Sequence, residues 1–253
     1  MQTHILKKPS SYSFEKVGIK ELGTRGNIMN TFPNTKQIVG SKACGPFCLL
    51  NIYAHLQIPL PLGTILKDLN MMETDTSYLP QLARHCNARK LDTVILSSNP
   101  HIISPTWKQK TKKEVINNLK EWVTYNNDGW LKACLFLLFY LQEGGNIKIV
   151  DLSTDIIDRY LDQGYTLLSC LEESWLWEKR KVEGRTEYDD IKGHTRGHIV
   201  VIYGKERDNY LISDPYPTRI EGRERLYKVS KQKLLIATLV WNQEILAVKK
   251  RAP

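Results

Sequence analysis

The spacing of apolar and polar residues along the chain predicts both helices and strands. Apolar positions recur every three or four residues in several segments, with proline, glycine or asparagine at their ends, which is typical of helices in a globular protein. The predicted helices cover residues 44–57, 63–69, 79–88, 112–125, 130–141, 154–161 and 226–239. Short runs rich in β-branched residues predict strands at residues 91–98, 147–153, 165–171, 198–204, 209–214 and 245–250.

Two of these strands follow one another late in the chain. Residues 198–204 and 209–214 are separated by the polar residues 205–208, which predicts an antiparallel hairpin with a four-residue loop. The charged stretch 172–197 has no sustained period, and we expect it to be a long irregular segment. Helices come mostly first and antiparallel strands mostly late, so the expected fold class is α+β, with an N-terminal helical part packed on a C-terminal antiparallel sheet.

Length and composition fit one large domain. The chain has 253 residues, 42% of them hydrophobic, which excludes a disordered or collagen-like protein. Residues 1–30 lack a sustained pattern and are expected to form an N-terminal arm, with a single domain over residues 31–250. The longest apolar run, residues 131–141, is shorter than the roughly 20 residues that span a membrane, and the N-terminus has no signal-peptide pattern. We therefore expect a cytoplasmic protein without a transmembrane segment.

The formal net charge of +9 is concentrated at the two ends of the chain. A basic surface is typical of proteins that bind nucleic acids or membranes. The basic residues here occur singly, without interleaved aromatic residues, which favours a solvated face or an acidic partner over nucleic acid. The five cysteines are an odd number in a chain too long to need disulfides, so we expect reduced thiols.

Cys44 is the first candidate for chemistry. It begins a predicted helix in the sequence Cys44-Gly45-Pro46. The first amides of a helix are unpaired and carry a partial positive charge, which favours a thiolate and can hold a developing oxyanion. Gly45 would let a substrate approach the backbone closely. The alternative is a small residue at an ordinary helix start.

His198 and Asp214 form a second constellation, more than 150 residues later. His198 opens one strand of the predicted hairpin and Asp214 ends the other, so both belong at the same end of the strand pair. A carboxylate beside an imidazole fixes its tautomer and stabilises its charged form. The alternative interpretation is an edge-strand histidine and an Asp-Pro turn.

These segments resemble a known family. ACGPFCLLNIYAHL, together with GHIVVIYGKERDNYLISDP, is similar to the papain-like cysteine peptidases related to those that cleave double-glycine leaders from bacteriocin precursors. The resemblance implies a stand-alone member of that family with a papain-like fold, in which Cys44 is the nucleophile, His198 the base and acid, and Asp214 the orienting residue. It also implies an oxyanion-hole glutamine, for which the candidate is Gln37. Gln37 lies one residue further upstream than is usual, and residues 39–41 would absorb the difference.

The remaining candidates concern the substrate cleft. Gly197, beside His198, is assigned with Gly45 to substrate binding, and Trp175 and Trp177 are expected to form one wall of a cleft or, alternatively, to pack at a strand end. The expected substrate is a peptide or protein. No cofactor is expected, because the chain has no glycine-rich phosphate motif in a strand–helix context.

Three alternatives remain open. A zinc site would use Cys44, Cys48, His194 and His198, although Gly193 and Gly197 disfavour the helix that would align the two histidines. An acyltransferase or transpeptidase would use the same triad and pass the acyl group to an amine. A non-catalytic binding module on the same fold would leave the thiol without special reactivity. The sequence does not indicate the oligomeric state.

Overall fold

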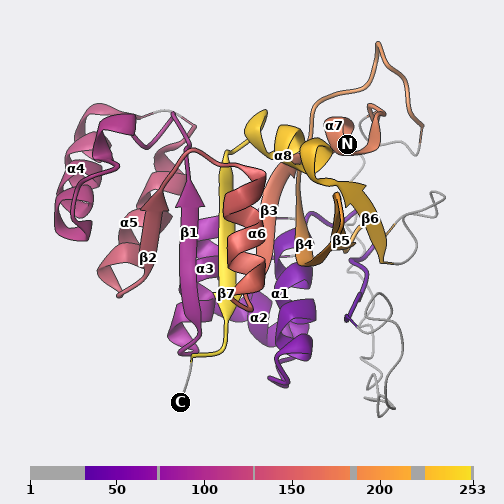
Figure 1. The fold of residues 1–253 in the computed structure, drawn as a ribbon, viewed down its shortest axis with the longest axis horizontal. Helices are drawn as coiled ribbons and strands as arrows, with labels where there is room; N and C mark the ends of the chain where they lie inside the picture. The colour runs from indigo at the N-terminus through magenta and orange to yellow at the C-terminus, as the bar shows by residue number, and fades with distance from the viewer. Residues whose placement is uncertain (1–31, 73–74, 128, 183–186, 218–225, 252–253) are drawn as a thin grey trace, which may run out of the picture.

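A computed structural model describes residues 32–72, 75–127, 129–182, 187–217 and 226–251 (Figure 1). The predicted arm, residues 1–30, lies outside the described residues. The helices are α1 (Cys44–His55), α2 (Leu62–Asp68), α3 (Leu79–Ala88), η2 (Pro105–Trp107, a 3₁₀ turn), α4 (Lys112–Tyr125), α5 (Leu131–Gln142), α6 (Thr154–Asp162), α7 (Glu173–Trp177) and α8 (Lys231–Leu239). The strands are β1 (Asp92–Ser97), β2 (Asn146–Ile149), β3 (Thr166–Glu172), β4 (Gly197–Glu206), β5 (Asn209–Ser213), β6 (Tyr227–Ser230) and β7 (Glu244–Lys249).

The strands form one sheet in the order β2-β1-β7-β3-β4-β5-β6. Only β1 and β2 are parallel among these neighbours, and the other pairs are antiparallel. The α+β class and the largely antiparallel sheet confirm the prediction. The sheet is not purely C-terminal, however, because β1 and β2 come from the first 150 residues and form one edge of it.

Helices cover both faces of the sheet (Figure 1). One buried cluster joins α1, α3 and α5 to one face, and a second joins α6 and α8 to the other. The alternation of side chains along a strand explains this division: Ile199 and Val201 of β4 belong to the first cluster, and Val200 and Ile202 to the second. A sheet covered on both faces needs strands that are apolar at every position, as β4 is at its centre.

Two local predictions were wrong. The hairpin loop has two residues instead of four, because β4 runs on to Glu206 and takes up a bulge between Ile202 and Gly204. The segment 226–239 is not one helix: β6 pairs with β5 and ends at Ser230, whose hydroxyl accepts the amide of Lys233 (3.2 Å) and starts α8.

The segment 172–197 is more regular than expected. It begins with α7, whose first turn is capped by the Glu172 carboxylate, which accepts the amide hydrogen of Trp175 at 2.9 Å. Backbone bridges then join Lys181 to Tyr188 and to His194. Among the described residues, no helix has the length and apolar character that crossing a membrane requires.

Candidate active site

Helix α1 places Cys44 beside the start of β4. The helix begins at Cys44 without a side-chain cap, and its first backbone bond runs from the amide of Phe47 to the carbonyl of Ala43 (3.1 Å). One turn further on, the buried thiol of Cys48 donates to the carbonyl of Ile199 (3.2 Å). Because Ile199 follows His198, this contact brings the N-terminal turn of α1 next to His198. Cys44 is half-buried there, and its sulfur also lies 3.9 Å from the carbonyl of Lys42.

His198 is the second residue of β4 and is 4% exposed. Its Nε2 donates to Asp214 Oδ1 at 2.7 Å, across the β4–β5 pair and just beyond the last residue of β5. Because Nε2 is engaged by Asp214, Nδ1 is the ring nitrogen left to face the thiol of Cys44. The structure thus joins three residues that are separated by 154 and 16 positions in the sequence.

The environment favours the charged form of His198. Burial opposes the charge of the ring, but the carboxylate of Asp214 attracts it and accepts its hydrogen bond, and Cys44 adds a hydrogen bond and a favourable charge. The net result raises the pKa of His198 from its ordinary value of 6.5 to about 10. The ring is also packed edge-on against Tyr216, with the two centroids 5.6 Å apart. An imidazolium beside a thiol is the arrangement that supports nucleophilic sulfur chemistry.

Asp214 is completely buried and held from several sides. Besides His198, its Oδ1 accepts the amide of Tyr216 (2.9 Å), while Oδ2 accepts the hydroxyl of Tyr227 (2.8 Å). The ammonium group of Lys36 donates to the Asp214 carbonyl (2.8 Å). Buried carboxylates persist as ions where donors surround them, and Asp214 has such donors. Sequence reasoning missed Tyr227, since it belongs to a segment that was predicted to be helical.

Gln37 lies next to these residues. Its amide nitrogen donates to the carbonyl of Pro215 (2.7 Å), which ties the segment before α1 to the residue after Asp214. Its side-chain Nε2 donates to the carbonyl of Ser41 (3.0 Å), and the side chain is buried. Between them, the amide of Ser41 bonds to the carbonyl of Ile38, closing a turn in which Gly40 has φ +82°. The chain between Gln37 and Cys44 therefore contains a tight turn.

The two glycines assigned to substrate binding are in tight contact with the chain itself. A Cβ at Gly45 would stand 2.1 Å from Ser77 Oγ and 2.9 Å from Leu82, so the close approach expected there is made by the chain's own Ser77. A Cβ at Gly197 would stand 2.6 Å from Nε1 of Trp241. Trp241 therefore lies beside the residue that precedes His198. No sequence motif marks it, and only the sheet order, in which β7 lies next to β3 and β3 next to β4, places it there.

Trp175 and Trp177 do not form one wall. Both lie in helix α7, and residues two apart in a helix point in different directions. Trp175 is 56% exposed, whereas Trp177 packs edge-on against Tyr227, with the two centroids 4.9 Å apart.

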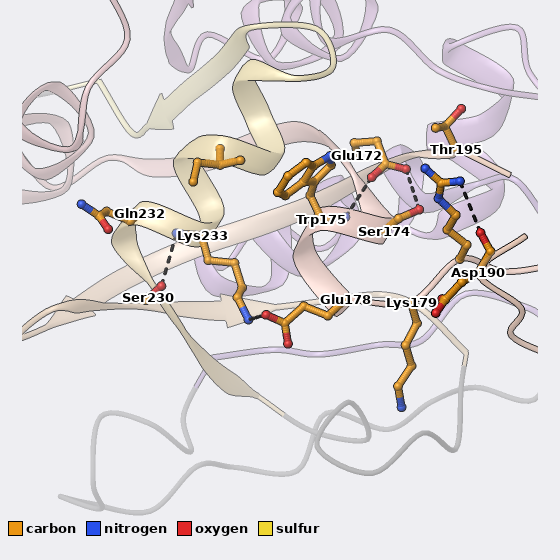
Figure 2. Close-up of a pocket in the computed structure, with 12 residues that line it drawn as sticks. Glu172, Ser174, Trp175, Glu178, Lys179, Asp190, Thr195, Ser230, Gln232 and Lys233 are labelled. Atoms are coloured by element: carbon orange, nitrogen blue, oxygen red, sulfur yellow. Dashed lines mark hydrogen bonds and ion pairs between the residues drawn. The ribbon is translucent and has the colours of Figure 1, made fainter. Parts of the chain in front are cut away.

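Trp175 lines an open groove of about 750 Å³ between α7 and α8 (Figure 2). The ion pair between Glu178 and Lys233 (2.7 Å) lies at its rim. The groove's lining, among the described residues, does not include Cys44, His198 or Asp214. It is nevertheless connected to the site, because Glu172, which caps α7, also accepts the amide of Arg196 (3.0 Å), two residues before His198.

The residues considered for zinc are arranged differently. Cys48 is buried against β4, where burial raises the pKa of its thiol, and His194 is exposed and paired with Lys181 through backbone bonds. In the described part of the chain, no group of three His, Cys, Asp or Glu residues is placed to hold a metal ion. The other cysteines, Cys86, Cys134 and Cys170, are buried thiols, as is typical of cysteines that serve in packing.

The fold resembles solved peptidase structures. A putative C39-like peptidase from Bacillus anthracis matches 89% of this chain and 98% of its own, with 10% identity and a TM-score of 0.46. The peptidase domain of Streptococcus ComA, a bifunctional ABC transporter of a quorum-sensing pathway, matches 87% of this chain and 99% of its own, with 11% identity and a TM-score of 0.44. No family model and no curated protein sequence matches the chain. Both structures are described as peptidases.

Proposed function

We propose that this protein is a cysteine peptidase-like hydrolase that cleaves an amide bond of a peptide or protein. The observation that carries the proposal is the connected set of Cys44, His198 and Asp214, in which a buried imidazole is hydrogen-bonded to a buried carboxylate and faces a thiol at a helix start. This set has a nucleophile, a base that contacts the nucleophile and an orienting group that contacts the base, as acyl transfer through a thioester requires.

In the first half of the proposed reaction, the sulfur of Cys44 forms a bond to the substrate carbonyl carbon, and the thiol proton is held by His198. The electron pair of the C=O bond moves to oxygen, where the amide of Cys44 and the side-chain amide of Gln37 would donate to it. His198 then gives its proton to the leaving nitrogen as the C–N bond breaks, and an acyl-thioester remains on Cys44.

In the second half, water attacks the thioester carbonyl and gives a proton to His198. The C–S bond breaks, the proton returns to sulfur, and a carboxylic acid leaves. Asp214 supports both halves, because it stabilises the imidazolium and keeps Nδ1 directed at the sulfur. The position of Gln37 supports its assignment: its side-chain nitrogen has two hydrogens, and the bond to Ser41 uses one of them.

The proposal is tested by trapping the acyl-enzyme. Peptides that carry an activated ester are mixed with the protein, and the intact mass is recorded on a scale of seconds, with fluorogenic peptide libraries screened in parallel. We expect a mass increase on Cys44 in the wild-type protein that disappears in Cys44→Ala and forms much more slowly in His198→Ala. Cys86→Ala is the matched control, because it removes a buried thiol of α3 whose hydrogen-bond partner is the hydroxyl of Tyr53 (3.4 Å).

An adduct that forms equally well in Cys44→Ala would contradict the proposal. Adding small amines to the same reaction separates the two fates of the thioester. A carboxylic acid as the main product supports hydrolysis, whereas an amide product would assign the chain to the acyltransferases.

A further inference from the structure

Asp214 is fixed on the oxygen that does not contact His198. The hydroxyl of Tyr227 donates to Oδ2 at 2.8 Å, while Oδ1 accepts from His198 at 2.7 Å. The two bonds pull on different oxygens of one carboxylate, so together they define the rotation of the carboxyl group about its bond to Cβ. The backbone amide of Tyr216, two residues further on, also donates to Oδ1 (2.9 Å) and ties the Asp214 side chain to the backbone that follows it.

Tyr227 is itself held in place by two elements. It is the first residue of β6, where it pairs with Ile212 of β5, two residues before Asp214. Side chains of paired residues on adjacent antiparallel strands lie on the same face, so the tyrosine ring extends alongside β5 toward Asp214. Trp177 of α7 packs edge-on against the ring (4.9 Å between centroids). The hydroxyl is therefore preorganised at Oδ2.

We propose that Tyr227 is a positioning residue of the active site: its hydroxyl holds the Asp214 carboxylate ionised and turned so that Oδ1 receives the proton of His198. The inference rests on the proposed function and extends it by one residue. A donor to a carboxylate favours the charged form, and a charged acceptor makes this hydrogen bond stronger than a neutral one. Tyr227 does not touch the reacting atoms, so its effect reaches Cys44 only through Asp214 and His198.

This arrangement predicts the direction in which the pH dependence of Cys44 reactivity changes when the Tyr227 hydroxyl is removed. Without the hydroxyl, the ionised form of Asp214 loses one stabilising donor, and the carboxyl group becomes protonated at a higher pH. A protonated Asp214 no longer supports the imidazolium of His198, and the reactivity of Cys44 falls. The loss of reactivity on acidification therefore begins at a higher pH when the hydroxyl is removed.

The test is the rate of alkylation of Cys44 between about pH 4 and 9 in Tyr227→Phe, which deletes the hydroxyl and keeps the ring. We expect the acid limb of the profile to move upward by about half a unit to one unit, and the rate near pH 5 to fall about threefold to tenfold. Tyr165→Phe is the matched control. The Tyr165 hydroxyl also donates to an aspartate, Asp92 Oδ2, at 2.6 Å. Asp92 belongs to β1, which is separated from β4 by β7 and β3 in the sheet. Loss of the Tyr165 hydroxyl should therefore leave the profile unchanged.

A double-mutant comparison separates positioning from general packing. In the Asp214→Asn background there is no carboxylate to hold, so Tyr227→Phe should change the rate less than about twofold. An equal effect of Tyr227→Phe in both backgrounds, or an unshifted acid limb in the single variant, would overturn the proposal. If Tyr227→Phe does not fold, difluorotyrosine placed at position 227 keeps the side chain and strengthens the donor. The acid limb should then move downward, and an unchanged profile would overturn the proposal.

The failure of this inference can be told apart from the failure of the proposed function. A wild-type Cys44 that reacts fast and depends on His198, together with a Tyr227→Phe variant identical to it, overturns the role of Tyr227 alone. A wild-type Cys44 that reacts no faster than the buried Cys86 overturns both.

Discussion

The charge on His198 is set mainly by Asp214, and replacing Asp214 by asparagine is expected to remove it. The substitution Asp214→Asn keeps the size of the side chain and removes its charge. Burial, the largest influence on the ring, is then opposed only by the smaller contribution of Cys44, and we expect the pKa of His198 to fall from about 10 to below its ordinary value of 6.5. Cys44→Ser should lower it less, because the contribution of Cys44 is smaller than that of Asp214.

The change in the protonation of His198 follows from its pKa in the wild-type protein and in Asp214→Asn. At pH 8, a group with a pKa of about 10 is roughly 99% protonated, while one with a pKa below 6.5 is less than about 5% protonated. The shift of more than three units corresponds to roughly 5 kcal/mol of differential stabilisation of the imidazolium. Because the folded-state pKa is raised, this stabilisation is complete below about pH 6.5 and is lost as the pH rises through about 10.

The assay is a long-range ¹H–¹⁵N spectrum of protein labelled at its six histidines, recorded at pH 8. His198→Gln identifies the signal of His198. We expect two ring nitrogens with the shifts of a cation in the wild-type protein and the shifts of a neutral ring in Asp214→Asn. A neutral His198 in the wild-type protein, or a cationic one in Asp214→Asn, would refute the reasoning.

Three further substitutions have defined outcomes. Burial raises the pKa of Glu244 from 4.5 to about 7, so its ionisation destabilises the fold increasingly as the pH rises through this range. Glu244→Gln should therefore raise the free energy of unfolding at pH 8 by about 1 to 3 kcal/mol. In urea titrations, the free energy of unfolding of this variant should also depend less on pH than that of the wild-type protein. Gly197→Ala should displace Trp241 and lower the free energy of unfolding by about 1 to 3 kcal/mol, measured in the same way; no change would mean that the contact is loose. Gln37→Ala should lower kcat on an activated ester about 100-fold while leaving the alkylation of Cys44 within about twofold of wild type, and an equal loss in both assays would contradict an oxyanion role.

The local parts of the fold could be predicted from the sequence because local signals decide them. The helix over residues 112–125 begins after Thr111, whose side chain forms a capping box with Glu114 in the first turn, and its predicted bounds agree with α4. The strand pair that carries His198 and Asp214 was also visible, because apolar β-branched runs on both sides of a short polar stretch predict a hairpin. These features are sufficient to bring a histidine and an aspartate to one end of two strands.

The parts that failed depend on contacts between distant segments. Residues 226–230 were predicted as helix, but residues 227–230 become β6 because they pair with β5, and no residue within the segment excludes a helix. The placement of Tyr227 at Asp214 and of Trp241 at Gly197 requires the complete strand order, which crosses between the two halves of the chain. The separation of Trp175 from Trp177 depends on α7, a short helix that Glu172 stabilises with its side chain.

The central claim is that Cys44 is an activated nucleophile that depends on His198. It is tested most directly by the rate at which iodoacetamide labels each of the five cysteines between about pH 5 and 9, in wild-type protein and in His198→Ala, followed by peptide mapping. The account predicts that Cys44 alone is labelled rapidly in the acidic part of this range and loses that reactivity without His198. Labelling of Cys44 that is no faster than labelling of Cys86, or that appears only on unfolding, would contradict it.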